Sequence, residues 1–243
     1  MTHAAAEAQT ELSVVNTRFM RRVFYIFGVL AALSAAISIA GKFYGASISM
    51  GGNTDVRTAR EIVIGNNVIR VPENEIRFDR QRVDGVTGRL DLYWRWPQLD
   101  GYSREASAAF NNSDNSKSIL FVSFEPKIMS RDMSGRFEPI YKSLVVEPPA
   151  PGPAGTRLYA FSEKSGYLNE TLVVGPEAAG RAPYVARCLS GSAAEEALAP
   201  CERDIEVGDD LSLIYRFPKS LLADWSALDA AVRRKAGAML LKR

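Results

Sequence analysis

An uncharged stretch of 19 residues near the N-terminus constrains this chain more than any other feature. It runs from Val23 to Gly41 and contains no Asp, Glu, Lys or Arg. As an α-helix it would be about 28 Å long, which is close to the hydrocarbon thickness of a bilayer. The stretch therefore predicts a single-pass membrane protein with one transmembrane helix at residues 23–41.

The charges on either side of this stretch predict its orientation. Arg18, Arg21 and Arg22 precede it, whereas only Lys42 follows it directly. Because Lys and Arg are enriched on the cytoplasmic side of membrane helices, we expect residues 1–22 to form a cytoplasmic tail. The C-terminal part of the chain would then lie outside the cytoplasm, in the periplasm if the membrane is a bacterial inner membrane.

A cleaved signal peptide is the alternative interpretation of the same stretch. Small residues around Ala35 and Ala36 resemble a processing site. The leader carries Glu7 and Glu11, however, and the apolar run is longer than the usual signal-peptide core. These two features favour a retained anchor.

Small residues recur every fourth position within the predicted span, at Gly28, Ala32, Ala36 and Ala40. On a helix they form one narrow ridge, and such ridges let two membrane helices approach closely. One hypothesis is therefore a homo-oligomer that associates through this ridge. The other interpretation is that alanine is simply abundant here, and the composition of the stretch favours it.

Two cysteines, Cys188 and Cys201, both lie in the part of the chain predicted to be external. Two cysteines that flank a small polar loop outside the cytoplasm predict one structural disulfide. A pair of free thiols is the alternative. The only histidine, His3, is predicted to lie across the membrane, so the two thiols lack the partners of a usual zinc site.

The charge balance and the missing motifs exclude several classes of function. The first 42 residues carry four basic and two acidic side chains, which leaves 26 of each sign among the other 201 residues. A neutral domain lacks the electrostatic attraction that supplies most nucleic-acid affinity, so we expect no nucleic-acid partner. A domain without histidine cannot hold a Ser-His-Asp triad, and no phosphate-binding or dinucleotide-binding glycine motif is present. We therefore predict no catalytic residues, no metal and no cofactor.

Two pairs of adjacent acids, Glu195-Glu196 and Asp209-Asp210, are interpreted as loop and turn residues. A carboxylate-based glycosidase needs two acids that the fold brings together, and no pattern in the sequence indicates such a pair.

Short runs rich in β-branched and aromatic residues recur through the soluble part, separated by turn residues, and favour antiparallel strands. Asn66-Asn67 is the predicted turn of a first hairpin. The predicted strands are 61–65, 68–71, 89–96, 118–124, 141–146, 156–161, 170–174, 184–188 and 211–217.

Two of these strands resemble each other. LDLYWRWP at 90–97 and LSLIYRFP at 211–218 share a Leu-x-Leu start, an arginine between aromatic residues and a final proline. Strand parity places the leucines and aromatics on one face and the arginines on the other. A duplication with its join near 147–155 would explain the likeness, but the flanking sequences do not align, which favours chance.

The C-terminal segment predicts an amphipathic helix that covers one face of the sheet, with Ser220 as its N-cap. A contact between its basic end and lipid or a partner is the alternative. The expected apolar face consists of Leu221, Trp225, Leu228, Val232, Met239 and Leu240.

The segments 62–78, 92–103 and 214–225, together with the cysteine pair, resemble uncharacterised transmembrane-anchored proteins of alphaproteobacteria. The resemblance implies a bacterial inner-membrane protein with a periplasmic domain. It implies no activity, and no functional residue can be transferred from it.

The sequence thus predicts an α+β protein with a tail at 1–22, a transmembrane helix at 23–41, a linker at 42–56 and a mainly antiparallel β domain at 57–243 that ends in an amphipathic helix. The favoured function is that of a non-enzymatic, membrane-anchored envelope protein that binds a protein partner. The alternative is a tethered domain that binds or cleaves cell-wall carbohydrate through carboxylates and the aromatic residues Trp94 and Trp96.

Overall fold

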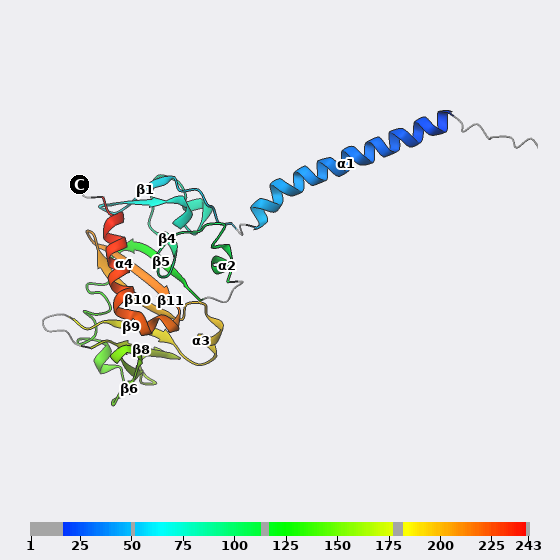
Figure 1. Cartoon of the computed structure of the whole chain (residues 1–243). Coiled ribbons are helices and arrows are strands. Elements are labelled where there is room, and N and C mark those ends of the chain that lie inside the picture. The colour runs from blue at the N-terminus through cyan, green and yellow to red at the C-terminus, as the bar shows by residue number, and fades with distance from the viewer. Residues whose placement is uncertain (1–16, 50–51, 113–116, 177–181, 242–243) are drawn as a thin grey trace, which may run out of the picture. The chain divides into compact units, whose positions relative to one another are not determined.

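The computed structural model describes residues 17–49, 52–112, 117–176 and 182–241. The chain forms two compact units, which divide after Ser49. Figure 1 shows a long helix in the first unit and a sheet with a covering helix in the second. The α+β fold expected from the sequence is the fold observed.

The first unit contains the helix α1, Thr17–Ser49. Its segment Arg18–Ile39 is long and apolar enough to cross a membrane, by length and composition. The linker predicted at 42–56 is wrong at its start, because α1 continues to Ser49 through residues that include no proline to stop it. It is wrong at its end too, since the carbonyl of Val56 accepts a hydrogen bond from Asn74 N–H within the second unit.

The second unit is built on an eight-stranded sheet in which all neighbouring strands are antiparallel. The spatial order is β4-β5-β11-β10-β9-β8-β7-β6. The strands are β4 Leu90–Arg95, β5 Ile119–Pro126, β6 Ala150–Pro151, β7 Arg157–Ala160, β8 Glu170–Val174, β9 Val185–Leu189, β10 Cys201–Val207 and β11 Leu211–Phe217.

A smaller sheet joins β1, Ala59–Ile64, to β2, Asn67–Pro72, and to the parallel strand β3, Gly85–Val86. The predicted hairpin is present, but its turn is Gly65-Asn66, one residue before the predicted pair. Gly65 has a φ of 56°, which glycine adopts without steric cost. Asn67 is instead the first residue of β2, and its side-chain amide donates a hydrogen bond to the Asp209 carbonyl at 2.7 Å.

The helices of the second unit are short except for the last. They are α2 Ser107–Phe110, α3 Ser192–Glu196 and α4 Trp225–Met239, with 3₁₀ turns η1 Glu73–Glu75, η2 Asp79–Gln81, η3 Tyr141–Ser143, η4 Pro153–Gly155 and η5 Lys219–Asp224. Figure 1 shows α4 crossing the sheet over β10 and β11. The predicted cap Ser220 lies inside η5, so α4 begins four residues later than expected.

The main core lies between α4, the small sheet and one face of the large sheet. In β4, Leu90, Leu92 and Trp94 are fully buried, and in β11 the corresponding residues Leu211, Leu213, Tyr215 and Phe217 are buried as well, which confirms the predicted parity. From α4, Leu228 and Val232 enter the same core with Ala236. A large apolar surface is thereby removed from water, and such burial is the dominant favourable contribution to folding.

Two expected features of the chain are absent from the described residues. The strand predicted at 141–146 is the turn η3 followed by an irregular segment, and Tyr141 is buried in a second cluster with Met133, Phe137 and Tyr159. The division into halves near 147–155 is not seen, because residues 150–151 pair with 157–158 inside the one sheet. The strand β10 was not predicted at all.

Candidate functional site

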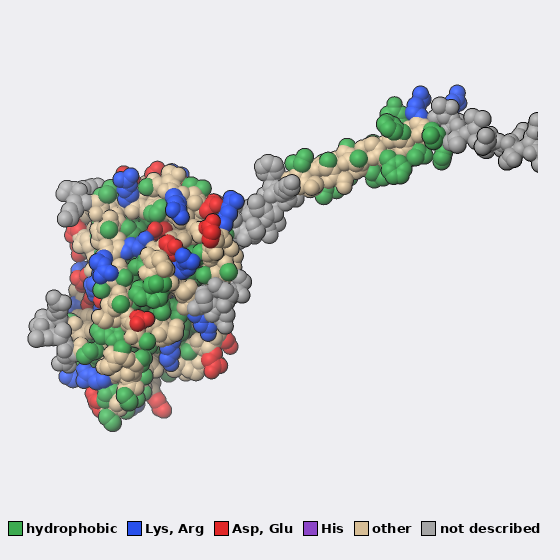
Figure 2. Space-filling view, viewed as in Figure 1, with side chains coloured by type: hydrophobic (Ala, Val, Ile, Leu, Met, Phe, Trp, Pro, Cys, Tyr) green, Lys and Arg blue, Asp and Glu red, His purple; other side chains and the backbone are tan. Residues whose placement is uncertain are grey.

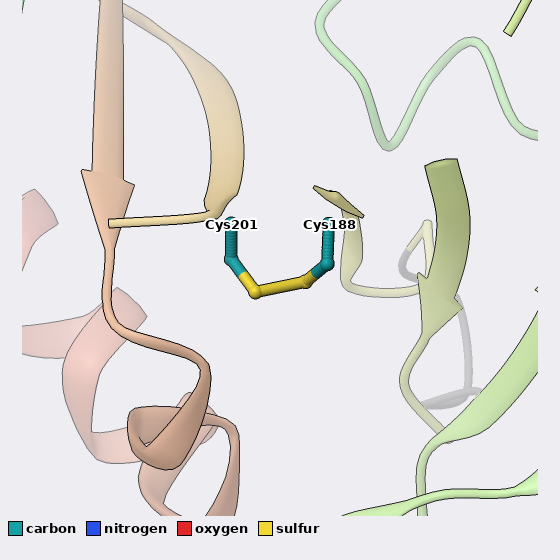
Figure 3. Close-up of a disulfide and its surroundings, with 2 residues drawn as sticks. All are labelled: Cys188 and Cys201. Carbon is teal, nitrogen blue, oxygen red and sulfur yellow. A yellow bond between two sulfur atoms is a disulfide. The ribbon is translucent and has the colours of Figure 1, made fainter. Parts of the chain in front are cut away.

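The predicted cysteine pair forms a disulfide that joins two neighbouring strands. Cys188 in β9 lies directly opposite Cys201 in β10, with the Cα atoms 3.9 Å apart (Figure 3). Both cysteines are buried in the main core. The bond closes a surface loop that contains α3 and the exposed side chain of Leu198.

The small residues of the predicted ridge lie on α1. Gly28, Ala32 and Ala36 are exposed in the described chain, and the space beside Gly28 is open. The side chain of Ala40 lies outside the described residues. The helix is described on its own, so the association predicted for this ridge stays a prediction.

The tryptophans proposed for carbohydrate binding are not available on the surface. Trp94 is fully buried, and its indole N–H donates a hydrogen bond to Glu75 Oε2 at 2.7 Å. Trp96 is partly buried against the main core. A sugar ring would have to stack on an exposed aromatic face, and Trp94 offers none.

The two acidic pairs of the sequence lie at the surface, as expected. Glu195 and Glu196 are exposed in α3, and Asp209 and Asp210 are exposed in the turn between β10 and β11. Among the described residues no group of three or more His, Cys, Asp or Glu side chains is arranged to hold a metal ion.

The face of the large sheet that points away from α4 is the best candidate for a functional surface. We call it the open face, because no helix of the described residues covers it between β4 and β10. Strand alternation brings polar and charged side chains to it from five strands. Its residues are Asp91, Phe121, Ser123, Glu125, Arg187, Glu202, Asp204, Glu206, Ser212, Ile214 and Arg216.

The charges of the open face are half-buried and paired across strands. Arg187 in β9 lies between Glu170 at 3.2 Å and Glu202 at 3.0 Å. Glu202 also accepts a hydrogen bond from Arg216 Nε at 2.8 Å. Arg136, from the loop after β5, places Nη2 2.7 Å from Asp204 Oδ1. The pairs fix these side chains in defined positions, so the face presents an ordered pattern of both signs of charge.

The pKa values of these groups record the competition between burial and pairing. Burial raises the pKa of the Asp204 carboxyl, and Arg136 opposes that rise only in part. Burial would also raise the pKa of Asp91, but hydrogen bonds from Arg89, Ser123 and Gln81 outweigh it and lower the pKa. Burial therefore outweighs pairing at Asp204, whereas pairing outweighs burial at Asp91.

Adjoining hollows lie along the open face. The central hollow, with a volume of about 230 Å³, lies between the outer surface of β10 and β11 and the loop 127–136. A second hollow of about 200 Å³ over β5 and β11 shares Glu202 and Ile214 with it. A third of about 430 Å³, which we call the aromatic hollow, shares Arg77 and Phe121 with the second.

Two apolar side chains stand exposed at the rim of the central hollow. Ile128 is 87% exposed and Met129 is 47% exposed, on the loop directly after β5. Arg131 follows on the same loop and has no carboxylate partner among the described residues. Protein-binding sites combine exposed apolar side chains with polar residues beside them, and this part of the surface offers both.

Sequence reasoning did not recognise β10, one of the strands that carry the open face. The segment CERDIEV at 201–207 has charges at four of its seven positions and was not recognised as a strand. Its alternation was nevertheless present, because Glu202, Asp204 and Glu206 point outward while Cys201 and Ile205 point inward. The buried Arg203 concealed the pattern.

Comparison with known proteins finds a similar fold but identifies no family. No family model matches the chain, and no curated protein matches it in sequence. A solved structure with a TM-score of 0.51 and 13% identity is Smlt3025, an immunity protein of the Stenotrophomonas maltophilia type IV secretion system. The match covers 77% of this chain and 95% of that one. At this identity the likeness shows the fold alone.

A second solved structure covers the same shares of the two chains at a TM-score of 0.42 and 9% identity. It is the iron-regulated outer membrane lipoprotein FrpD of Neisseria meningitidis.

Proposed function

We propose that the chain is a single-pass inner-membrane protein of a bacterial envelope whose periplasmic domain binds another protein through the open face. The observation that carries this proposal is the ordered, mixed-charge surface over β5, β11 and β10, with the exposed Ile128 and Met129 at its rim. Charge pattern gives specificity in protein complexes, and apolar side chains supply much of the affinity.

The placement in the envelope rests on the apolar helix and on the disulfide. Arg18–Ile39 of α1 has the length and composition of a membrane span, and basic side chains gather at its N-terminal end (Figure 2). Structural disulfides persist in oxidising compartments such as the periplasm. The proposed orientation predicts that a protease added outside intact spheroplasts digests residues 52–243, and protection of that fragment would contradict it.

A binding role without catalysis is favoured by the chemistry of the open face. The carboxylates Glu202 and Asp204 are each engaged by an arginine. Two edge strands are also partly occupied. The Asp91 carbonyl of β4 accepts a hydrogen bond from Arg77 N–H, and the Val68 carbonyl of β2 accepts one from Leu241 N–H. A partner would therefore contact side chains on the face and would not extend the sheet. Smlt3025, which has a similar fold, is an immunity protein of a type IV secretion system.

Nucleic acid is a poor candidate for the partner. Figure 2 shows basic, acidic and hydrophobic side chains interspersed over the displayed face of the second unit, with no extended basic field. The soluble part has equal numbers of basic and acidic residues. A neutral surface of alternating charge matches another protein better than a phosphate backbone.

The test is crosslinking and affinity purification of the full chain from native membranes. We expect the wild type to capture a defined protein, and Ile128→Asp and Arg131→Glu to lose it because they change the rim of the central hollow. Arg234→Glu is the matched control, since Arg234 is exposed on α4 at the opposite side of the sheet. Recovery of no partner by the wild type, or equal recovery by all variants, would refute the proposal.

A further inference from the structure

The aromatic hollow differs in chemistry from the rest of the open face. Its wall is mainly apolar and comes from the η2 segment, β4, α2, β5 and the disulfide loop. The apolar lining consists of Phe78, Tyr93, Phe110, Ile119, Phe121 and Leu198. A volume of about 430 Å³ is in the range of pockets that hold small molecules or a few side chains.

Two arginines contact aromatic rings that line this hollow: Arg77 lines the hollow itself, and Arg80 stacks on the lining residue Phe78. The Arg77 guanidinium lies 5.0 Å from the centre of the Phe78 ring and 4.8 Å from that of Phe121. The Arg80 guanidinium lies 5.2 Å from the Phe78 ring. Stacking on a ring face leaves the N–H groups at the edge of a guanidinium free to donate hydrogen bonds.

The nearby acid does not neutralise these two cations. Asp79 lies between them in sequence, but its Oδ1 accepts a hydrogen bond from Arg82 at 3.2 Å. Within the described residues, neither Arg77 nor Arg80 has a carboxylate within ion-pair distance. The hollow therefore combines an apolar wall with the Arg77 guanidinium, and Arg80 adds a second positive charge on the Phe78 ring; neither has an anionic partner among the described residues.

The segment that carries the arginines is held by the backbone. Arg77 N–H donates to the Asp91 carbonyl of β4 at 2.9 Å, and Ile76 forms a bridge with Leu92. Arg82 further fixes the segment, since its side chain donates to the carbonyls of Ile76 and Gly52. The position of the cations beside the apolar wall is thus set before any ligand binds, which lowers the entropic cost of binding.

We propose that the aromatic hollow binds an acidic and aromatic segment of the partner protein. The inference rests on the proposed function, because it names the chemistry of the partner at one end of the open face. A carboxylate of the segment accepts hydrogen bonds from Arg77 and Arg80, and an adjacent aromatic side chain enters the space beside Phe110 and Phe121. Planar guanidinium groups bind carboxylates in a bidentate manner, and paired aromatic rings add to the affinity.

An anionic lipid headgroup is the other source of this chemistry, and a protein segment is favoured. The hollow continues into the mixed-charge part of the open face through Arg77 and Phe121, which is the surface proposed to bind a protein.

The test measures peptide binding to the full chain in nanodiscs of neutral lipid by fluorescence anisotropy. The probe is a labelled peptide of alternating Glu and Phe, and the comparison peptides replace Glu by Lys or Phe by Ser. We expect saturable binding of the Glu-Phe peptide only. Arg77→Ala and Arg80→Ala should each weaken it about tenfold or more, the usual effect of a lost charge-assisted hydrogen bond, whereas Arg234→Ala should not.

Three outcomes would overturn the inference. They are equal binding of the Lys-Phe peptide, unchanged binding by both arginine variants, and displacement of the Glu-Phe peptide by anionic nanodisc lipid. The failures of the two proposals are distinguishable. Capture of the native partner by an Arg77→Ala chain would refute this inference alone, and peptide binding without any captured partner would refute the proposed function alone.

Discussion

Replacing Asp229 by Ala in α4 should strongly destabilise the second unit. Asp229 Oδ1 accepts hydrogen bonds from Arg203 Nε and from the Tyr215 hydroxyl, each at 2.9 Å. Its other oxygen accepts from Arg233 Nε at 2.9 Å. Arg203 is 3% exposed, so its positive charge would stay buried after the carboxylate is removed.

The expected loss follows from that buried charge. Removing one partner of a buried ion pair costs about 3–5 kcal/mol. For a domain of this size, 1 kcal/mol corresponds to about 2–4 °C in Tm, so the Tm should fall by roughly 6–20 °C. Asp229→Asn keeps an oxygen that can accept a hydrogen bond and should lose less. Asp224→Ala, at an exposed position just before α4, should change stability by no more than about 0.5 kcal/mol.

Tryptophan fluorescence of the full chain in detergent measures this stability selectively, because all three tryptophans, Trp94, Trp96 and Trp225, lie in the second unit. Burial by itself raises the pKa of Asp229, but Arg203 and Arg233 outweigh that effect and lower it. The contribution of the Asp229 carboxylate to folding stability is therefore present at neutral pH and is lost as the pH falls through the lowered pKa. An Asp229→Ala chain as stable as Asp224→Ala at pH 7 would refute this reasoning.

Three further changes test other parts of the structure. Replacing Cys188 and Cys201 by Ala should cost about 3 kcal/mol in denaturant unfolding, and reduction of the wild type should reproduce the loss; an unchanged midpoint would contradict the structural role of the bond. Burial raises the pKa of the Glu75 carboxyl, and Lys235 opposes that rise in part. The contribution of this carboxyl to folding stability is therefore lost as the pH rises through the raised pKa. The stability of Glu75→Gln relative to wild type should therefore increase from pH 4 to pH 7, and a decrease would contradict the assignment. If the small-residue ridge of α1 mediates association, Ala32→Leu or Ala36→Leu should weaken the signal in a transmembrane two-hybrid assay, whereas Ala31→Leu on another face should not.

Strand alternation made much of the large sheet predictable. The segments 170–174 and 211–217 were predicted with the observed bounds, because each is a short run rich in apolar residues between turn residues. The same parity rule assigned Trp94 to the core face with Leu90 and Leu92. It therefore already argued against the use of Trp94 as a surface residue for carbohydrate, and the structure confirms its burial.

The errors arose where distant residues decide local structure. Arg203 points from β10 into the core, where its guanidinium donates hydrogen bonds to Asp229 of α4, the Val185 carbonyl of β9 and the Ser134 hydroxyl. The hairpin turn shifted by one residue because Asn67 bonds to Asp209, 142 residues away. Neither contact can be read from the local pattern.

The open face could not be recognised before the strand order was known. Its residues come from segments that are far apart in the sequence, and only the order β4-β5-β11-β10-β9 brings Asp91, Glu202 and Arg187 to one surface. The disulfide, in contrast, could be predicted from the count and placement of two cysteines alone.

Site-specific photo-crosslinking in cells tests the central claim most directly. A photoreactive amino acid would replace Ile128 on the open face in one strain and Arg234 on the surface of α4 in another. We expect irradiation to yield one defined protein adduct from position 128 and none from position 234. The absence of an adduct at position 128, or the same adducts from both positions, would contradict the claim that this domain binds a protein through its open face.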